Sequence, residues 1–553
     1  MSSSSSASST TVAATAFCAG ALSGVALYAA LERVRRQRAL ASTAPLDPRN
    51  VAAMREPAAA VTDLIVQYME NLYRKDKTRG SPKSSSYAVR AQIEPDSIKK
   101  QLPLSCPETP ESYEDIFRDC KDIIFPGLTH WASPDFFAYF KIHGSEPSVL
   151  ADYLGSALNV IGFSWVAAPA ATELEQVVCD WMARLLGLPE CFLSTTVGGG
   201  VIQGSASESA LCAMIAARQA ALEGLKGEER AARAAKLCAY VSDQTHSIGE
   251  KACMVLDIPH LRVVKTRRGA VDEDNYGLDA QDMAAAMAED IAKGLVPFFL
   301  IPTVGTTSTT AIDPVRALAR VAKQQPYPVW VHVDGAYGGA AAVCPEYQHW
   351  FDGVEECDSV CVNSHKWLMV CFGCSLLWVK DRRPLIQALA LHPEYLKNDF
   401  MSQVQYKDWQ VGLGRRFSSL KLWFTLRRFG AVGLQKHIRR SIEHAKHAER
   451  LLLADGRFRL FVPVRTALVC FHVAFGGRDL TETLLREVNA SGRVFLIHSV
   501  VDGVFFLRLA IGGLEVDDWN IQNVVEVLSE TLSSIIERES KWQLAYNEFV
   551  KQA

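Results

Sequence analysis

The stretch "DSVCVNSHKWLMV", Asp358 to Val370, places one lysine, Lys366, on a short polar turn between two apolar runs. Short apolar runs rich in branched residues are typical of buried strands. Lysine is seldom buried unless it has a partner or a chemical role. A lysine that ends a strand and reaches for solvent is the ordinary alternative. The residues around this stretch decide between the two interpretations.

Similar apolar runs precede this stretch and alternate with helical patterns. The runs cover 238–243, 261–266, 297–305, 329–335 and 358–364, and the helical patterns cover 170–186 and 207–223. Continuous apolar strands separated by helices predict an α/β fold with a mainly parallel sheet covered on both faces. After about residue 400 a long helical pattern at 433–453, two strand-like runs, and helical patterns near 480–489 and at 517–536 predict a smaller α+β domain.

The composition is that of a globular protein, with 553 residues, 49% of them apolar, and a net charge of −3. Positive and negative residues are mixed throughout, which disfavours a nucleic-acid partner. The 14 cysteines are scattered and do not form two matching CxxC pairs. A zinc site or a disulfide framework is therefore not expected.

The first 57 residues differ from the rest of the chain. Residues 11–31 form an uncharged run of 21 residues, which is followed by Glu32 and a cluster of arginines. This length just spans a bilayer, and basic residues after it favour a catalytic body on the cytoplasmic side. The pattern predicts a membrane anchor within residues 1–40; a cleaved organelle-targeting peptide and an unstructured leader are the alternatives. Residues 41–57 contain three prolines and predict a linker, and residues 58–73 predict an amphipathic helix.

Polar residues that follow the predicted strands are candidates for a ligand site, because open α/β sheets bind ligands at the carboxyl ends of their strands. Asp334 ends one apolar run, where a buried carboxylate needs a cationic partner. His246 and Thr303 follow two other runs. Each has an ordinary structural alternative, as a turn cap, a hydrogen-bonding histidine or part of a polar loop.

A glycine-rich stretch, "GGGVIQGSAS" from Gly198 to Ser207, leads into a helical pattern. The helix N-terminus and the hydroxyls of Ser205 and Ser207 would suit a phosphate. Two nucleotide-binding motifs do not fit. Ser205 stands where a P-loop needs lysine, and Gln203 stands where GxGxxG needs its last glycine. A capped helix after a flexible loop is the alternative.

Together these features suit one cofactor, pyridoxal phosphate. This molecule has a phosphate at one end, a basic ring nitrogen at the other and an aldehyde between them. It would use Lys366 as its Schiff-base lysine, Asp334 on the ring nitrogen and the helix N-terminus for the phosphate.

Eight motifs resemble those of the group II pyridoxal-phosphate-dependent decarboxylases, in the same order. They are "HWASPDFFAYF", "IGFSWVAAPAATELE", "GGGVIQGSASES", "SDQTHSIGEKA", "VGTTST", "HVDGAYGG", "NSHKWL" and "LGRRFSSLKLWF". They are most similar to those of aromatic-L-amino-acid decarboxylases, from about residue 58 into the C-terminal domain. The resemblance implies the aspartate-aminotransferase-like fold (fold type I) and an intertwined homodimer. It implies a dimer-clasp segment at 58–145, a large cofactor-binding domain at 146–400 and a small domain at 401–553.

The resemblance also implies roles for four catalytic residues. Lys366 matches the Schiff-base lysine, Asp334 the partner of the pyridinium nitrogen, and His246 the histidine stacked over the cofactor ring. Tyr395, in the segment 389–400, matches the tyrosine of a mobile loop that protonates the reacting carbon. The implied cofactor contacts are Ser205, Ala206, Ser207, His246, Thr303, Asp334, Ala336, Asn363, His365 and Lys366.

The substrate pocket implied by the resemblance is apolar and holds an aromatic side chain. The partner subunit would lend Ile161 and Phe163, and Gly414 leaves room that some relatives fill with serine. The implied pocket residues are Trp131, Tyr139, Phe140, Ile142, Ile161, Phe163 and Gly414, and no metal ligand is implied. One departure is that Lys141, Ile142 and His143 stand where aromatic decarboxylases usually have a Pro-Thr-Ala type of run. Either these basic side chains reach the pocket and favour an acidic or polar substrate, or they turn outward as most lysines do.

The expected reaction, on this resemblance, converts an aromatic L-amino acid such as tryptophan, tyrosine or a hydroxylated relative to its amine and CO₂. Family members that form aldehydes tend to carry Phe for Tyr395 or Asn for His246, and both positions here have the decarboxylase residue. The alternatives are an acidic amino-acid substrate, aldehyde-forming decarboxylation with oxidative deamination, and a non-catalytic scaffold tethered to a membrane.

Overall fold

The computed structural model describes residues 51–552 apart from 82, 143, 270–274, 392 and 398. The predicted anchor or targeting segment at 1–40 lies outside the described residues. No helix within the described ranges is both long enough and apolar enough to cross a membrane.

A seven-stranded sheet forms the centre of the larger part of the molecule, in the order β1-β7-β6-β5-β4-β2-β3. The strands β2 to β6 pair in parallel, whereas β7 pairs antiparallel with β6 and with β1. The predicted mainly parallel sheet is therefore confirmed. Its strands are β1 (Gly199–Gln203), β2 (Leu237–Ser242), β3 (His260–Val264), β4 (Val296–Leu300), β5 (Trp330–Asp334), β6 (Ser359–Asn363) and β7 (Ser375–Val379).

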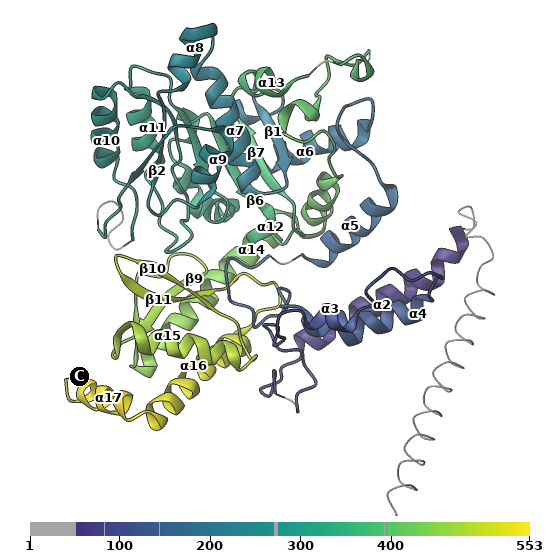
Figure 1. Cartoon of the computed structure of the whole chain (residues 1–553), viewed down its shortest axis with the longest axis vertical. Helices are drawn as coiled ribbons and strands as arrows, with labels where there is room; N and C mark the ends of the chain where they lie inside the picture. Colours follow the sequence, from purple (N-terminus) through teal and green to yellow (C-terminus); the bar gives the residue numbers. More distant parts are fainter. Residues whose placement is uncertain are drawn as a thin grey trace, which may run out of the picture.

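Helices cover both faces of this sheet, as Figure 1 shows. Alternate residues of β2 belong to two hydrophobic clusters: Cys238 and Tyr240 to one, Ala239 and Val241 to the other. Burial on both faces explains why these strands are continuous apolar runs without polar alternation. The helices of the chain are α2 (Arg55–Tyr73), α3 (Ser97–Gln101), α4 (Tyr113–Asp119), α5 (Glu146–Leu158), α6 (Pro169–Leu185), α7 (Ala206–Ala221), α8 (Gly227–Ala234), α9 (Ile248–Leu256), α10 (Ala280–Ala292), α11 (Val315–Lys323), α12 (Ser364–Trp367), α13 (Arg383–Leu389), α14 (Ser418–Asp455), α15 (Gly477–Ala490), α16 (Asp518–Arg538) and α17 (Ser540–Gln552).

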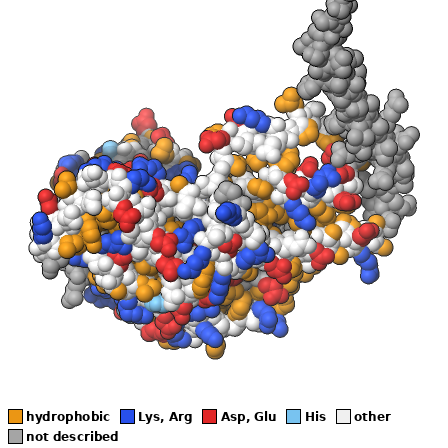
Figure 2. Space-filling view, turned by 90° about the horizontal axis from the view of Figure 1, so that it is seen from below, with side chains coloured by type: hydrophobic (Ala, Val, Ile, Leu, Met, Phe, Trp, Pro, Cys, Tyr) orange, Lys and Arg blue, Asp and Glu red, His pale blue; other side chains and the backbone are white. Residues whose placement is uncertain are grey.

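A second sheet lies in the C-terminal part, with the strand order β10-β11-β9-β8. The N-terminal helices α2 to α4 form an arm beside it (Figure 1). Figure 2 shows apolar side chains exposed on this arm, and Ile65, Val66 and Ile116 are among its exposed residues. The strands of the second sheet are β8 (Phe458–Leu460), β9 (Leu468–Val473), β10 (Ile497–Val501) and β11 (Val504–Ala510).

The segment before α5 runs along this C-terminal part. The N–H of Phe137 donates to the Phe495 carbonyl at 2.9 Å, and the N–H of Ala510 donates to the Phe137 carbonyl at 3.0 Å. The segment thus joins the C-terminal part to the central sheet.

One local prediction and one local alternative were wrong. The predicted linker at 41–57 is helical from residue 51, with a 3-10 helix Val51–Met54 followed by α2, because Pro57 falls in the first turn of α2, where proline is tolerated. The glycine-rich stretch is no flexible loop, because Gly199–Gln203 pairs residue by residue with β7. The long helix predicted at 433–453 is confirmed as the second half of α14, which begins at Ser418 and is interrupted by a kink at Gly430.

Candidate active site

The carboxyl ends of three adjacent strands bring the predicted polar residues together. Asp334 is the last residue of β5, Asn363 is the last residue of β6, and Thr303 follows β4 and pairs with Asp334 in an isolated bridge. All three are buried. One oxygen of Asp334, Oδ1, accepts hydrogen bonds from the N–H of Ala336 at 3.0 Å and from the thiol of Cys361 at 3.7 Å. These two donors hold the carboxylate in one orientation.

Lys366 lies on α12, which begins directly after β6. Burial lowers the pKa of the Lys366 ammonium, while Asp334 and Cys361 favour its charged form and Arg508 opposes it. A lowered pKa increases the fraction of neutral amine, which is the nucleophilic form of lysine. His246 follows β2, and its pKa responds to the charges of Asp334 and Lys366. Burial lowers its pKa, Asp334 opposes the shift and Lys366 adds to it.

An aromatic wall lies beside Lys366. Its Nζ is 5.7 Å from the centre of the Phe140 ring. Phe140 stacks on Tyr337 with 3.6 Å between ring centres, and Tyr337 stacks on Trp367 at 4.8 Å. Such stacked rings pack rigidly and contribute beyond their buried area. They give the site one flat apolar side.

Sequence reasoning missed Arg508, in β11. The residue is 2% exposed, and its guanidinium carbon is 5.0 Å from the centre of the Phe140 ring. Its Nε and Nη2 have no hydrogen-bond partner within the described part of the chain. The available signal was a charged residue in the middle of the apolar run "GVFFLRLAI", because arginine is almost never fully buried without a partner.

The residues predicted to hold a phosphate lie at the N-terminus of α7. Ser205 is its N-cap, and the hydroxyl of Ser205 accepts a hydrogen bond from the Glu208 N–H at 3.3 Å; Ala206 and Ser207 form the first turn. His365 lies on α12 and accepts a hydrogen bond at Nδ1 from the Cys374 N–H at 3.1 Å. Burial, with help from Lys366, lowers the pKa of His365 to about 4. The imidazole is therefore neutral at pH 7 and carries its proton on Nε2.

Two orphaned polar atoms at these strand ends test whether pyridoxal phosphate fits. Thr303 Oγ1 and Asn363 Oδ1 are buried and lack a hydrogen-bond partner among the described residues. Buried polar atoms are nearly always paired, so such atoms indicate a missing polar ligand. With an amine, a carboxylate and a helix N-terminus close by, the residues present fit a phosphorylated pyridine aldehyde.

A family model described as the pyridoxal-dependent decarboxylase conserved domain matches residues 95–474. The chain belongs to the pyridoxal-dependent decarboxylase family. The decarboxylase is 42% identical to tryptophan decarboxylase 2 of Oryza sativa subsp. japonica over 504 residues, covering 89% of this chain and 97% of the relative. It is 41% identical to phenylacetaldehyde synthase of Petunia hybrida over 489 residues, covering 85% of this chain and 92% of the relative. The solved structure of Oryza sativa TDC with PLP and tryptamine superposes with a TM-score of 0.82 at 38% identity, covering 89% of this chain and 99% of that one.

Several predicted site residues of the decarboxylase are exposed in the single chain. Tyr395 belongs to a 3-10 helix, Glu394–Leu396, and is 77% exposed. Trp131 and Tyr139 stack on each other at 5.3 Å, and both are exposed.

Three further pocket candidates lie near the loop before α14. Ile161 is exposed, and its Cγ2 is 3.9 Å from where a Cβ of Gly414 would stand. Phe163 is partly buried, and its carbonyl accepts a hydrogen bond from the Lys407 N–H at 2.8 Å. Ile142, beside Lys141, is also partly buried.

Lys141 does not turn outward. It is 3% exposed, and its Nζ donates a hydrogen bond to the Ser133 carbonyl at 2.7 Å. The outward alternative is wrong for this residue, and His143 lies outside the described residues. Lys141, Phe140 and Lys366 line one small cavity, together with Gly512.

Proposed function

We propose that this decarboxylase converts an aromatic L-amino acid to its amine and CO₂. The proposal depends on where Lys366 lies. This lysine, whose pKa is lowered, is beside the Phe140 ring and at the end of the strand pair β5–β6 that holds Asp334. The amine suits a carbonyl cofactor, and the flat apolar wall suits an aromatic side chain. The names of the relatives, a tryptophan decarboxylase and a phenylacetaldehyde synthase, support the aromatic class.

Pyridoxal phosphate, when bound, supplies an electron-accepting ring that stabilises the charge left on the substrate when CO₂ departs. Lys366 would hold its aldehyde carbon, and Asp334 would hold a proton on its ring nitrogen. The residues Ser205, Ala206, Ser207, Asn363 and His365 would hold its phosphate, Thr303 and Ala336 would lie beside the ring, and His246 would stack on it. The Oδ1 atom of Asp334 is taken by its two donors, which leaves the other oxygen for the ring nitrogen.

Tyr395 supplies the proton that replaces CO₂ on the substrate carbon. Its side chain is 77% exposed in one chain, whereas the Lys366 site lies at buried strand ends. A partner subunit, or movement of its segment, would bring the phenol to that site. Aldehyde formation is the second candidate function, favoured by the 41% identity to phenylacetaldehyde synthase. The presence of Tyr395 and His246 favours the amine.

The homodimer belongs to the same proposal. Leu150, Tyr153, Leu154 and Leu158 expose one apolar stripe of α5 to solvent in the single chain. The spacing is that of a helix face that packs on another surface. A second copy on this face would cover the stripe and lend Ile161 and Phe163 to the neighbouring site.

An amino-acid panel tests the proposed function. The protein is supplied with pyridoxal phosphate and assayed with tryptophan, tyrosine, phenylalanine, glutamate and aspartate for amine, aldehyde, CO₂ and ammonia. We expect amine and CO₂ from at least one aromatic amino acid and none from the acidic ones. Lys366→Ala serves as the reference, and we expect it to lose the visible absorbance of bound cofactor and the activity. Amine release from acidic substrates alone, or an active Lys366→Ala variant, would refute the proposal.

A further inference from the structure

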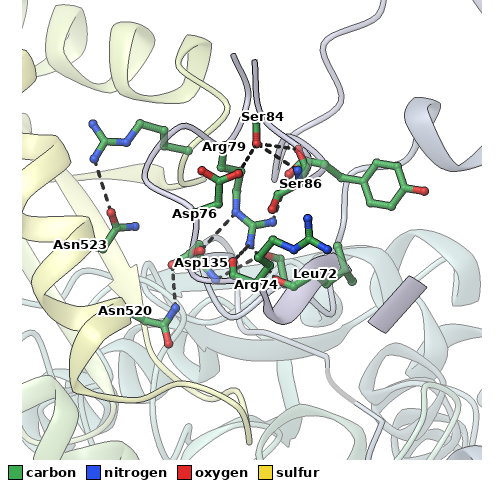
Figure 3. A network of polar contacts seen from close by, with 12 residues as sticks. Leu72, Arg74, Asp76, Arg79, Ser84, Ser86, Asp135, Asn520 and Asn523 are labelled. Atoms are coloured by element: carbon green, nitrogen blue, oxygen red, sulfur yellow. Dashed lines mark hydrogen bonds and ion pairs between the residues drawn. The ribbon is translucent and has the colours of Figure 1, made fainter. Parts of the chain in front are cut away.

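Four charged residues, three of them buried, form a cluster beside the proposed site, and the proposed reaction does not use them. Arg79 and Asp135 are each 1% exposed at the side chain, with Arg79 Nε 3.5 Å from Asp135 Oδ2. Figure 3 shows this pair, with Asn520 donating to Asp135 from α16. Lys141 and Glu515 complete the cluster, because Glu515 and then Asp135 are the charges that most favour the protonated form of Lys141.

The two positive and two negative charges of this cluster balance. Burial raises the pKa of Asp135, and Arg79, Asn520 and Lys141 oppose that shift. Burial lowers the pKa of Lys141 to about 8, which still leaves it mainly protonated at pH 7. Removing one member of a buried ion pair leaves an uncompensated charge, which is costly. Lys141 is therefore the countercharge that this cluster requires.

Two backbone features fix the position of the Lys141 ammonium. Its hydrogen bond to the Ser133 carbonyl, 2.7 Å long, closes the segment 133–141 on itself. A Cβ on Gly513 would stand 2.5 Å from Lys141 Nζ. The glycine leaves the space that the ammonium occupies, so Lys141 and Gly513 form a matched pair.

The segment 133–141, which this hydrogen bond closes, contains Phe140, a residue of the proposed active site. Tyr139 has a φ of +55°, in the left-handed region that bulky side chains avoid. Such a conformation persists only where the surroundings hold it. Phe140 follows it, stacks on Tyr337 at 3.6 Å and lies 5.7 Å from Lys366 Nζ. The Lys141–Ser133 bond therefore restrains the strained turn that presents Phe140 to Lys366.

We propose that Lys141 is a positioning residue for decarboxylation. Its ammonium, bonded to the Ser133 carbonyl between Asp135 and Glu515, holds Phe140 in place beside Lys366 and does not contact the substrate. This inference rests on the proposed function of Lys366. Lys141 stands where aromatic decarboxylases usually have a Pro-Thr-Ala type of run. On this inference its ammonium pairs with the enzyme's own carboxylates and not with that of an acidic substrate.

The experiment compares four holoenzymes. Lys141→Met removes the ammonium and keeps an unbranched side chain that ends one atom earlier, at the position of the lysine Cε. Gly513→Ala keeps every charge and puts a methyl group where the ammonium lies. Lys141→Met/Glu515→Gln restores charge balance without the bond to Ser133. The matched control is Lys293→Met, which removes a surface lysine that also pairs with a carboxylate, that of Glu289.

The measured quantities are kcat, KM, the melting temperature and the circular dichroism of the bound cofactor. For Lys141→Met we expect kcat to fall by about 10- to 100-fold, as for a small misplacement of a reacting group, and KM for the aromatic substrate to change by less than about threefold. The cofactor signal changes, since Phe140 is displaced. Gly513→Ala lowers kcat in the wild-type background and has a smaller effect on Lys141→Met. The shortest contact of its Cβ is with Lys141 Nζ, and the next is with Val516 Cγ2 at 3.0 Å. The charge-balanced double variant recovers the melting temperature but not kcat. Lys293→Met changes none of these.

Three results would overturn the inference. The first is a wild-type kcat in Lys141→Met. The second is recovery of kcat together with the melting temperature in the double variant, which would make the role purely structural. The third is a change of much more than about threefold in the KM for the aromatic substrate in Lys141→Met, which would place Lys141 on the substrate. Each of these is separate from failure of the proposed function, which an active Lys366→Ala variant would reveal.

Discussion

Tyr395 and Lys366 differ in their surroundings, although both are assigned to the same reaction. Lys366 has a pKa lowered by burial at the end of the sheet, whereas the Tyr395 side chain is 77% exposed. A residue that is exposed in one chain contributes little to the folding of that chain. Substituting Tyr395 therefore tests chemistry without disturbing the fold.

We expect Tyr395→Phe to redirect the product from amine to aldehyde. Removing the phenol removes the proton donor, and loss of a general acid lowers the affected step by about 100-fold or more. Amine, aldehyde and ammonia are quantified by chromatography after complete conversion of the preferred substrate, and the melting temperature stays unchanged. Tyr113→Phe, at another exposed tyrosine, is the control and keeps the amine as product. An unchanged amine yield in Tyr395→Phe would remove the role assigned to Tyr395.

At the scale of one element, α14 depends on Gly430. This residue interrupts the helix with φ 62° and ψ 179°, a region that is almost exclusive to glycine. We expect Gly430→Ala to lower the free energy of unfolding by about 1–3 kcal/mol, from backbone strain alone, since a Cβ at Gly430 would meet no atom within 4 Å. Urea unfolding measures the change. The control is Gly155→Ala in α5, where the nearest atom to the new Cβ would be 3.9 Å away; there alanine should stabilise by about 0.5–1 kcal/mol. Equal effects of the two substitutions would contradict this account of the kink.

For the whole molecule, three buried histidines make the folded state less stable in mild acid. Burial lowers the pKa of His130, His332 and His365 from 6.5 to about 4 in each case. Between these values the unfolded chain binds the protons and the folded chain does not, so the free energy of unfolding falls as the pH is lowered through this window. Two buried carboxyls act in the opposite direction, because burial raises the pKa of Asp313 to about 7 and that of Asp358 to about 6. His332→Gln isolates the histidine contribution. From about pH 7 to about pH 4.5 we expect the melting temperature of the wild type to fall relative to that of His332→Gln, which has one such proton fewer. The same pH dependence of the melting temperature in the wild type and in His332→Gln would contradict the prediction.

The proposed dimer gives a second prediction at this scale. Leu154 is 43% exposed on the apolar stripe of α5. We expect Leu154→Glu to convert the dimer to monomers and to lower activity sharply, because a buried, unpaired carboxylate opposes association. Sedimentation velocity at several concentrations gives the mass. The control is Leu453→Glu, at an equally exposed leucine near the end of α14, which should leave mass and activity unchanged. A wild-type protein that sediments as a monomer would refute the dimer.

The sequence by itself determined the strand ends, and through them most of the candidate cofactor site. Asp334, Thr303 and Asn363 could be placed at one edge of the sheet because apolar runs of strand length mark where each parallel strand stops. Ser205 could be placed at a helix N-terminus because its side chain is a preferred cap for the helix that follows. These are local properties, visible within about ten residues of sequence.

Only the tertiary structure decided where the long charged side chains lie. Lys141 does not end a strand and does not cap a helix, so no local pattern predicts where its side chain lies. Its direction depends on Asp135, on Glu515 from the far end of the chain, and on the space left by Gly513. Arg508 is held in the same way, inside β11 and against the Phe140 ring. A buried charge takes its position from partners that folding brings together from distant parts of the sequence, and no local pattern records those partners.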